Sequence, residues 1–86
     1  MTESLAAKAH QLNPTVWIGK KGIDEQLILE IKKQLKKNKL VKVKMLKGAI
    51  EEHELDRKKV PALIAEQTDA EIVQQVGFVF TLYKDP

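Results

Sequence analysis

A four-residue loop combines residue types that favour phosphate binding: Gly19, Lys20, Lys21 and Gly22. Glycines let a backbone turn sharply and approach a ligand without a Cβ in the way, and the two lysines between them point cationic side chains outward. The following residues predict a helix that begins at Asp24, whose first backbone N–H groups are free to face an anion. The loop is therefore a candidate phosphate site.

Catalytic and metal chemistry have little support elsewhere in the chain. His10 and His53 are the only histidines, and the one serine near either of them is Ser4, so the sequence does not support a catalytic triad. The acidic residues around His53 are metal-ligand types, but they lack a paired histidine at helical spacing or the glycine of a calcium loop. We interpret this segment as a solvated acidic connector, and we expect no metal, no cofactor and no enzymatic activity.

The nucleotide-binding loop of NTPases is also excluded by spacing. That loop has four residues between its glycines and then Gly-Lys-Ser/Thr, so that the lysine reaches the terminal phosphates and the hydroxyl holds magnesium. Here Gly22 is followed by Ile23 and Asp24, which supply no hydroxyl, and the Asp24 carboxylate would repel a triphosphate.

A nucleic-acid backbone clamp requires less, since KH domains hold nucleotides by their backbone with a Gly-x-x-Gly loop. Charge along the chain favours this interpretation. The segment from Lys20 to Lys47 carries ten lysines and three acidic residues, a net charge of +7, whereas residues 48–86 have four basic and eight acidic residues, a net charge of −4. A polyanion would be drawn to the basic segment. Besides the loop, its candidate RNA-binding residues are Lys32, Lys33, Lys36, Lys37, Lys42 and Lys44.

Each of these features also has a simpler structural interpretation. The loop could be a strand-to-helix turn whose glycines only satisfy unusual dihedral angles, and lysines late in a helix favour its dipole or form a solvated face. Lys20 and Lys21 lie at the opposite helix end, where a cation is unfavourable and an anion would relieve the cost. Trp17 could stack on a base, but its place in an apolar strand favours the core.

Length and composition indicate a single domain spanning residues 1–86. The chain is 43% hydrophobic and contains no cysteine, which excludes disulfides and thiolate sites. It has no apolar run near the roughly 20 residues of a membrane helix, and its start lacks the pattern of a signal peptide. We expect a soluble, cytoplasmic protein.

Periodicity predicts an α/β fold of the order α-β-α-β-α-β-β. A strand-helix-strand crossover requires a parallel pair, and Gly77 marks a hairpin, so we expect a mixed four-stranded sheet packed with helices. Residues 50–55 are ambiguous between a loop and a helical turn. The predicted helices span residues 4–11, 24–38 and 57–68, and the predicted strands span residues 15–18, 40–46, 71–76 and 78–83.

The two basic elements have clear faces. In the helix over residues 24–38, an apolar stripe that includes Ile31 and Leu35 faces the core, while four lysines and Leu29 face solvent. In the following strand, Val41, Val43 and Met45 alternate with Lys42 and Lys44, which predicts one buried and one basic face. In the third helix, Asp56 is the predicted N-cap, and Pro61 requires an early position or a kink.

Taken together, these residues resemble a CRM domain, the chloroplast RNA splicing and ribosome maturation domain, in its stand-alone prokaryotic YhbY-type form. The resemblance covers nearly the whole chain. It is carried by Leu5-Ala6-Ala7-Lys8-Ala9-His10 with Asn13-Pro14, Trp17-Ile18-Gly19-Lys20-Lys21-Gly22, Leu40-Val41-Lys42-Val43-Lys44, and Val76-Gly77-Phe78-Val79-Phe80-Thr81-Leu82-Tyr83-Lys84.

The resemblance implies a fold related to the C-terminal domain of a bacterial translation initiation factor, an RNA-contacting Gly-x-x-Gly loop, and association with precursors of the large ribosomal subunit without catalysis. Many family members have a small hydroxyl residue where this chain has Asp24. Both residue types cap a helix, so we expect Asp24 to act as a cap and not as a phosphate contact. An alternative is a protein-interaction module that binds a ribosomal protein or assembly factor through Leu29 and the acidic third helix.

Overall fold

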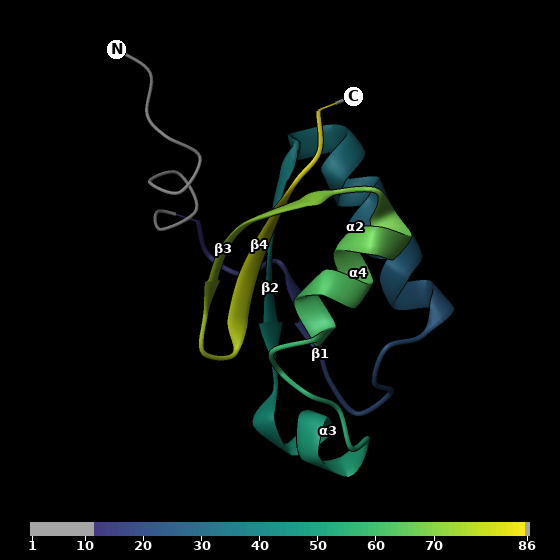
Figure 1. Cartoon of the computed structure of the whole chain (residues 1–86). Coiled ribbons are helices and arrows are strands. Elements are labelled where there is room, and N and C mark those ends of the chain that lie inside the picture. The colour runs from purple at the N-terminus through teal and green to yellow at the C-terminus, as the bar shows by residue number, and fades with distance from the viewer. Residues whose placement is uncertain (1–11, 86) are drawn as a thin grey trace.

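Four strands form one mixed sheet in the order β1-β2-β4-β3 (Figure 1). The structure is a computed structural model that describes residues 12–85. β1 (Val16–Ile18) is parallel to β2 (Leu40–Met45), and β4 (Val79–Tyr83) is antiparallel to both β2 and β3 (Glu71–Val76). The predicted mixed sheet and its parallel crossover pair are confirmed.

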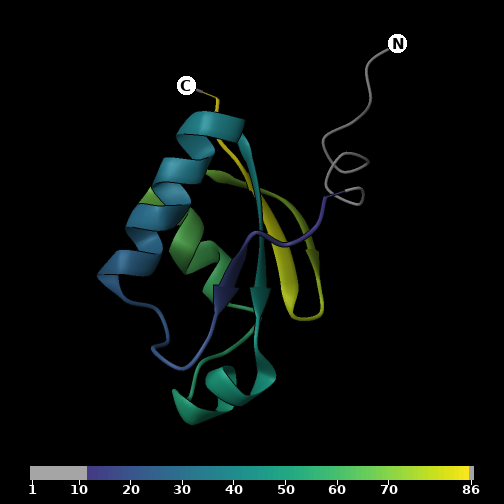
Figure 2. The same cartoon turned by 180° about the vertical axis from the view of Figure 1, so that it is seen from behind.

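Helices cover one face of this sheet. Figure 2 shows α2 (Glu25–Asn38) and α4 (Val60–Thr68) side by side on that face, while the short α3 (Lys47–Glu52) lies at the end of the sheet near the loop between β1 and α2. The predicted helix over residues 4–11 lies outside the described residues. Among residues 12–85 no helix covers the opposite face of the sheet, which we call the open face.

α2 matches its sequence prediction closely. Its core-facing side chains Ile28, Ile31 and Leu35 are buried, and its lysines lie on the solvent side. The helix begins after Asp24 and ends at Lys39, which adopts a left-handed conformation (φ 67°) and donates its N–H to the Leu35 carbonyl at 2.9 Å. The apolar stripe therefore attaches α2 to the sheet and leaves the basic side exposed.

Strand alternation explains the two faces of the sheet. Val41, Val43 and Met45 of β2 are buried against the helices, so Lys42 and Lys44 point to the open face, as predicted. One core receives side chains from all the described elements except β3 and the acidic end of α3. Its large, fully buried members include Ile18, Ile31, Leu35, Met45, Ile64, Phe80 and Leu82.

The region between β2 and α4 differs from the prediction. Residues 47–52 form a helix, which includes the first part of the segment 50–55 that the sequence left ambiguous between a loop and a helical turn. α4 begins at Val60, three residues later than predicted. Pro61 occupies the first turn of α4, where its missing N–H is not needed; a helix starting at Arg57 would have required that N–H. Asp56 caps the preceding turn instead, because its Oδ1 accepts from the Lys58 N–H at 2.8 Å.

Trp17 is the main core assignment that was wrong. β1 is a three-residue edge strand in which Val16 and Ile18 are buried, whereas the Trp17 side chain is 53% exposed. An edge strand with helices on only one face alternates between core and solvent, and Trp17 falls on the open side. The aromatic ring is therefore available at the surface.

Candidate nucleic-acid interface

The loop from Gly19 to Gly22 is a closed turn at the exit of β1. The Gly22 N–H donates to the Gly19 carbonyl at 2.8 Å, which brings the ends of the loop together. Lys20 and Lys21 occupy its tip, and both side chains are exposed. The turn therefore presents two adjacent ammonium groups to solvent at the point where α2 begins.

The two glycines of the loop have different roles. Gly22 is buried in a left-handed conformation (φ +70°), and a Cβ there would lie 3.1 Å from three ring atoms of His53. Gly19 is not in the left-handed region, and its Cβ would only meet Leu46 Cδ1 at 3.6 Å, an ordinary contact. The space beside Gly22, which we expected to admit a ligand, is filled by a side chain of the protein.

The His53 side chain forms a hydrogen bond with the backbone of the loop. Its Nε2 lies 2.7 Å from the Lys20 carbonyl oxygen, and since a carbonyl only accepts, Nε2 carries the hydrogen. His53 directly follows α3, so this short helix places the imidazole beneath the turn. The interpretation of His53 as part of a solvated connector missed this contact, which joins residues 33 positions apart and has no local sequence signal.

Asp24 is the N-cap of α2, as predicted. Its Oδ1 accepts from the Leu27 N–H at 2.8 Å. The carboxylate therefore satisfies a free donor of the first turn and places a negative charge at the helix N-terminus. An anion that approaches the loop meets the lysines of the turn and not an open helix end.

The four α2 lysines lie side by side on the solvent side of the helix. Lys32 and Lys36 lie nearest the end of α4, where they line a hollow with its residues. Lys33 and Lys37 lie next to them, toward the side of Gln34, whose side chain accepts a hydrogen bond from the Thr15 hydroxyl just before β1 at 2.6 Å. All four lysines are exposed, so they form one continuous basic face.

The β2 lysines lie on the opposite side of the sheet from α2. Lys44 is exposed and pairs in register with Trp17 of β1, which places the two residues next to each other on the open face. Lys42 is half-buried, and its Nζ donates to the Leu12 carbonyl at 3.0 Å. The candidate residues therefore form three groups around β1: the loop tip, the flanks of α2, and the open face of the sheet.

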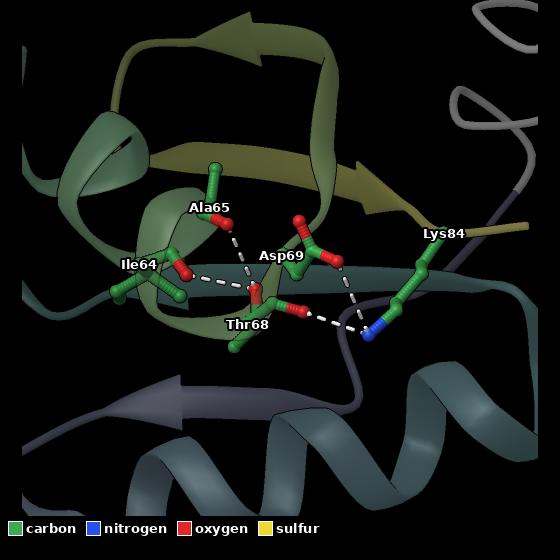
Figure 3. A network of polar contacts seen from close by, with 5 residues as sticks. All are labelled: Ile64, Ala65, Thr68, Asp69 and Lys84. Carbon is green, nitrogen blue, oxygen red and sulfur yellow. Dashed lines mark hydrogen bonds and ion pairs between the residues drawn. The ribbon is translucent and has the colours of Figure 1, made fainter.

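Lys84 belongs to a separate network at the end of α4 (Figure 3). Its Nζ donates to the Thr68 carbonyl at 3.3 Å and lies 4.0 Å from an Asp69 carboxylate oxygen. The Thr68 hydroxyl in turn donates to the Ile64 carbonyl at 2.7 Å. Lys84 thus acts as a C-terminal cation for α4 and ties the end of β4 to it.

Other site types find no support in residues 12–85. No group of three or more His, Asp or Glu side chains in this range is arranged to hold a metal ion. Within the same residues, no helix is both long enough and apolar enough to cross a membrane.

Comparison with known proteins finds one matching family model and several relatives of similar sequence. The family model described as the CRS1 / YhbY (CRM) domain matches residues 2–84. A Methanocaldococcus jannaschii protein named "Probable RNA-binding protein" is 43% identical over 98% of this chain, which spans only 60% of that relative's length.

Other relatives are closer to this chain in length. A Bacillus subtilis protein named "Probable RNA-binding protein YqeI" is 31% identical over 94% of this chain and 80% of its own. A Haemophilus influenzae protein named "RNA-binding protein" is 34% identical over 93% of this chain and 77% of its own. The solution structure of a hypothetical protein from Staphylococcus aureus superposes with a TM-score of 0.76 at 32% identity, over 95% of this chain and 81% of that one.

Proposed function

The chain belongs to the CRS1/YhbY (CRM) domain family, and from this premise we propose that it binds RNA by its phosphates through the loop of Lys20 and Lys21. The names of its relatives from three organisms, each called an RNA-binding protein or a probable one, support the ligand class. The position of the two lysines supports the site.

One observation carries the proposal: two adjacent, exposed lysines lie on a turn that the protein itself holds in shape. The Gly22 to Gly19 hydrogen bond closes the turn at 2.8 Å, and His53 anchors its backbone at Lys20 at 2.7 Å. A turn that is already ordered loses little conformational entropy when a phosphate binds. Solvation alone would not require the lysine pair to be supported in this way.

The proposed path of the RNA backbone starts at the loop tip. On one side it continues over Lys33 and Lys37 of α2, which lie nearer the side of Gln34 and β1 than Lys32 and Lys36 do, and on the other it reaches Lys44 on the open face. Lys32 and Lys36 extend the basic surface toward the end of α4, and Lys42 borders the open face. Because lysine is a point charge and not a planar fork, affinity should exceed sequence specificity.

We further propose that the RNA is ribosomal RNA in precursors of the large ribosomal subunit, bound in the cytoplasm, because this is the role that the resemblance to CRM domains implies. Sedimentation of the protein with particles from a lysate, followed by sequencing of the bound RNA, tests this assignment. Enrichment of large-subunit precursor RNA is the expected result. Recovery of unrelated RNA would reject the ribosomal assignment while leaving RNA binding intact.

The test of the binding site is a salt titration with matched charge variants. For the parent protein, log K for an rRNA fragment should fall linearly with log salt, with a slope of about −0.7 to −0.9 per phosphate contact. The variant Lys20→Glu/Lys21→Glu should bind weakly and show a shallower slope. The control Lys58→Glu/Lys59→Glu alters another exposed lysine pair by the same charge and should bind nearly as the parent does.

A flat salt response would refute phosphate binding, and equal losses in both double variants would refute the site. The lysines of α2 provide a second comparison. We expect Lys33→Glu/Lys37→Glu to reduce affinity more than Lys32→Glu/Lys36→Glu, because the first pair lies nearer β1 and the second borders the end of α4.

A second candidate function is binding of a protein partner. The observation that favours it is the exposure of two large apolar side chains on the helices, Leu29 at 56% and Leu63 at 42%. Capture of partners from a lysate before and after nuclease treatment separates the two functions. A ribosomal protein or assembly factor that stays bound after RNA is digested, and is lost in Leu29→Ser, would support the second candidate.

A further inference from the structure

Trp17 exposes more than half of its surface although its neighbours in β1 are buried. Val16 is 4% and Ile18 is 0% exposed, whereas Trp17 is 53% exposed. Trp17 does not fill the core as a large aromatic residue usually does, because the alternation of the strand turns the indole to the open side. The ring is therefore free to contact a ligand.

The same tryptophan borders the proposed phosphate site. One shallow hollow is lined by Trp17, by the loop from Gly19 to Gly22, and by Asp24, Gln26 and Leu27 of the first turn of α2. Only Ile18 separates Trp17 from the loop in sequence, and its side chain points into the core. Trp17 and the two loop lysines thus line one surface depression.

A row of register partners extends this surface across the sheet. Trp17 pairs with Lys44, Lys44 with Val79, and Val79 with Val76 at the other edge. Lys44 is exposed, Val79 is half-buried, and Val76 is 63% exposed. The indole is thus flanked by lysines on two sides, at the loop and on β2, and faces a partly apolar strip.

We propose that Trp17 is a stacking platform for the base of an unpaired nucleotide whose flanking phosphates lie at Lys20, Lys21 and Lys44. This inference rests on the proposed function and specifies its substrate class as an unpaired RNA segment. A base stacks on an exposed aromatic ring only when it is free of a duplex, since paired bases are already stacked on their neighbours. The positive charge on both sides of the ring fits a nucleotide, which carries its charge beside its base, better than it fits an apolar protein surface.

The chain offers a direct probe, because Trp17 is its only tryptophan. A short unstructured oligoribonucleotide added at low salt should quench the intrinsic fluorescence in proportion to binding. The same oligonucleotide annealed to its complement should bind more weakly and quench little. Binding of both forms with equal affinity and an unchanged Trp17 signal would overturn the proposal.

Substitutions provide the second readout. Stacking on an aromatic side chain contributes enough per base that Trp17→Leu should weaken binding of the single strand by about 5-fold to 150-fold. Trp17→Phe keeps an aromatic face and should recover much of that loss. Both variants should melt near the parent temperature because the residue is largely exposed, and circular dichroism checks this.

The outcomes separate this inference from the proposed function. If Lys20→Glu/Lys21→Glu weakens binding but Trp17→Leu does not, RNA binding at the loop stands and the stacking platform is refuted. If neither variant alters affinity, the site itself is wrong, and both proposals fail. A loss in Trp17→Leu that Trp17→Phe does not recover would also count against stacking.

Discussion

Alanine at Gly22 should destabilise the protein by an amount that depends on His53. Two physical costs combine at this position. The left-handed backbone (φ +70°) costs a residue with a Cβ about 1 to 2 kcal/mol. The new Cβ would also lie 3.1 Å from three ring atoms of His53, so the ring must shift by a few tenths of an ångström, which weakens its hydrogen bond to Lys20. A hydrogen bond contributes about 1 kcal/mol net.

These terms predict a loss of about 1 to 3 kcal/mol for Gly22→Ala and about 1 kcal/mol for His53→Ala. Once the ring is absent, the alanine has nothing to displace, so the double variant should lose only the backbone cost and the hydrogen bond, about 2 to 3 kcal/mol in total. The cycle should therefore give a coupling free energy of up to about 1 kcal/mol between the two positions.

Urea denaturation followed by far-ultraviolet circular dichroism measures all four proteins, with equal m-values as the sign that they unfold alike. Gly19→Ala is the matched control. Its Cβ would meet only Leu46 Cδ1 at 3.6 Å, so its stability should stay within about 0.5 kcal/mol of the parent. Additive losses in the double variant, or a Gly19→Ala loss as large as that of Gly22→Ala, would refute the contact between His53 and the loop.

Three further substitutions probe other parts of the molecule. Asp24→Ala should cost about 1 kcal/mol of stability in urea denaturation because the Leu27 N–H loses its acceptor. Asp24→Ser should keep the cap and raise RNA affinity about 2-fold to 5-fold, because it removes a negative charge beside the loop. Equal RNA affinities of Asp24→Ser and the parent would show that no phosphate comes near this position. Lys39→Gly should raise the free energy of unfolding by up to about 1 kcal/mol, since glycine adopts φ 67° without strain, and a lower melting temperature would contradict this. Thr81→Val should stabilise the fold by about 1 kcal/mol in the same assay, because the fully buried Thr81 hydroxyl has no hydrogen-bond partner among the described residues. A destabilised variant would show that the hydroxyl makes a stabilising hydrogen bond.

Much of the fold was predictable because its elements have strong local signals. The apolar stripe of α2, its Asp24 cap and the alternation of β2 each depend on residues a few positions apart, and all three predictions are confirmed. The hairpin of β3 and β4 is confirmed with Gly77 in its turn (φ +58°). Local chemistry sets such features, so sequence patterns report them.

Predictions that depended on which surfaces are covered were less accurate. The composition of β1 favoured a buried Trp17, but burial depends on strand order, and β1 lies at an edge of the sheet, where the helices of the described residues cover only the other face. The start of α4 was placed too early because Asp56 is a suitable cap for either a helix or a turn, and Pro61 decides between them.

The candidate site likewise combines features that the sequence predicts with features that only the structure shows. The residue types of the loop from Gly19 to Gly22, the basic charge that follows it and the capping role of Asp24 all follow from the sequence, because composition and spacing carry that information. Only the tertiary structure brings His53 to the Lys20 carbonyl from 33 positions away, places Lys32 and Lys36 beside the end of α4, and turns Trp17 toward solvent beside Lys44. These features arise from long-range packing, in which residues far apart in the chain meet because the sheet and helices bury one shared core.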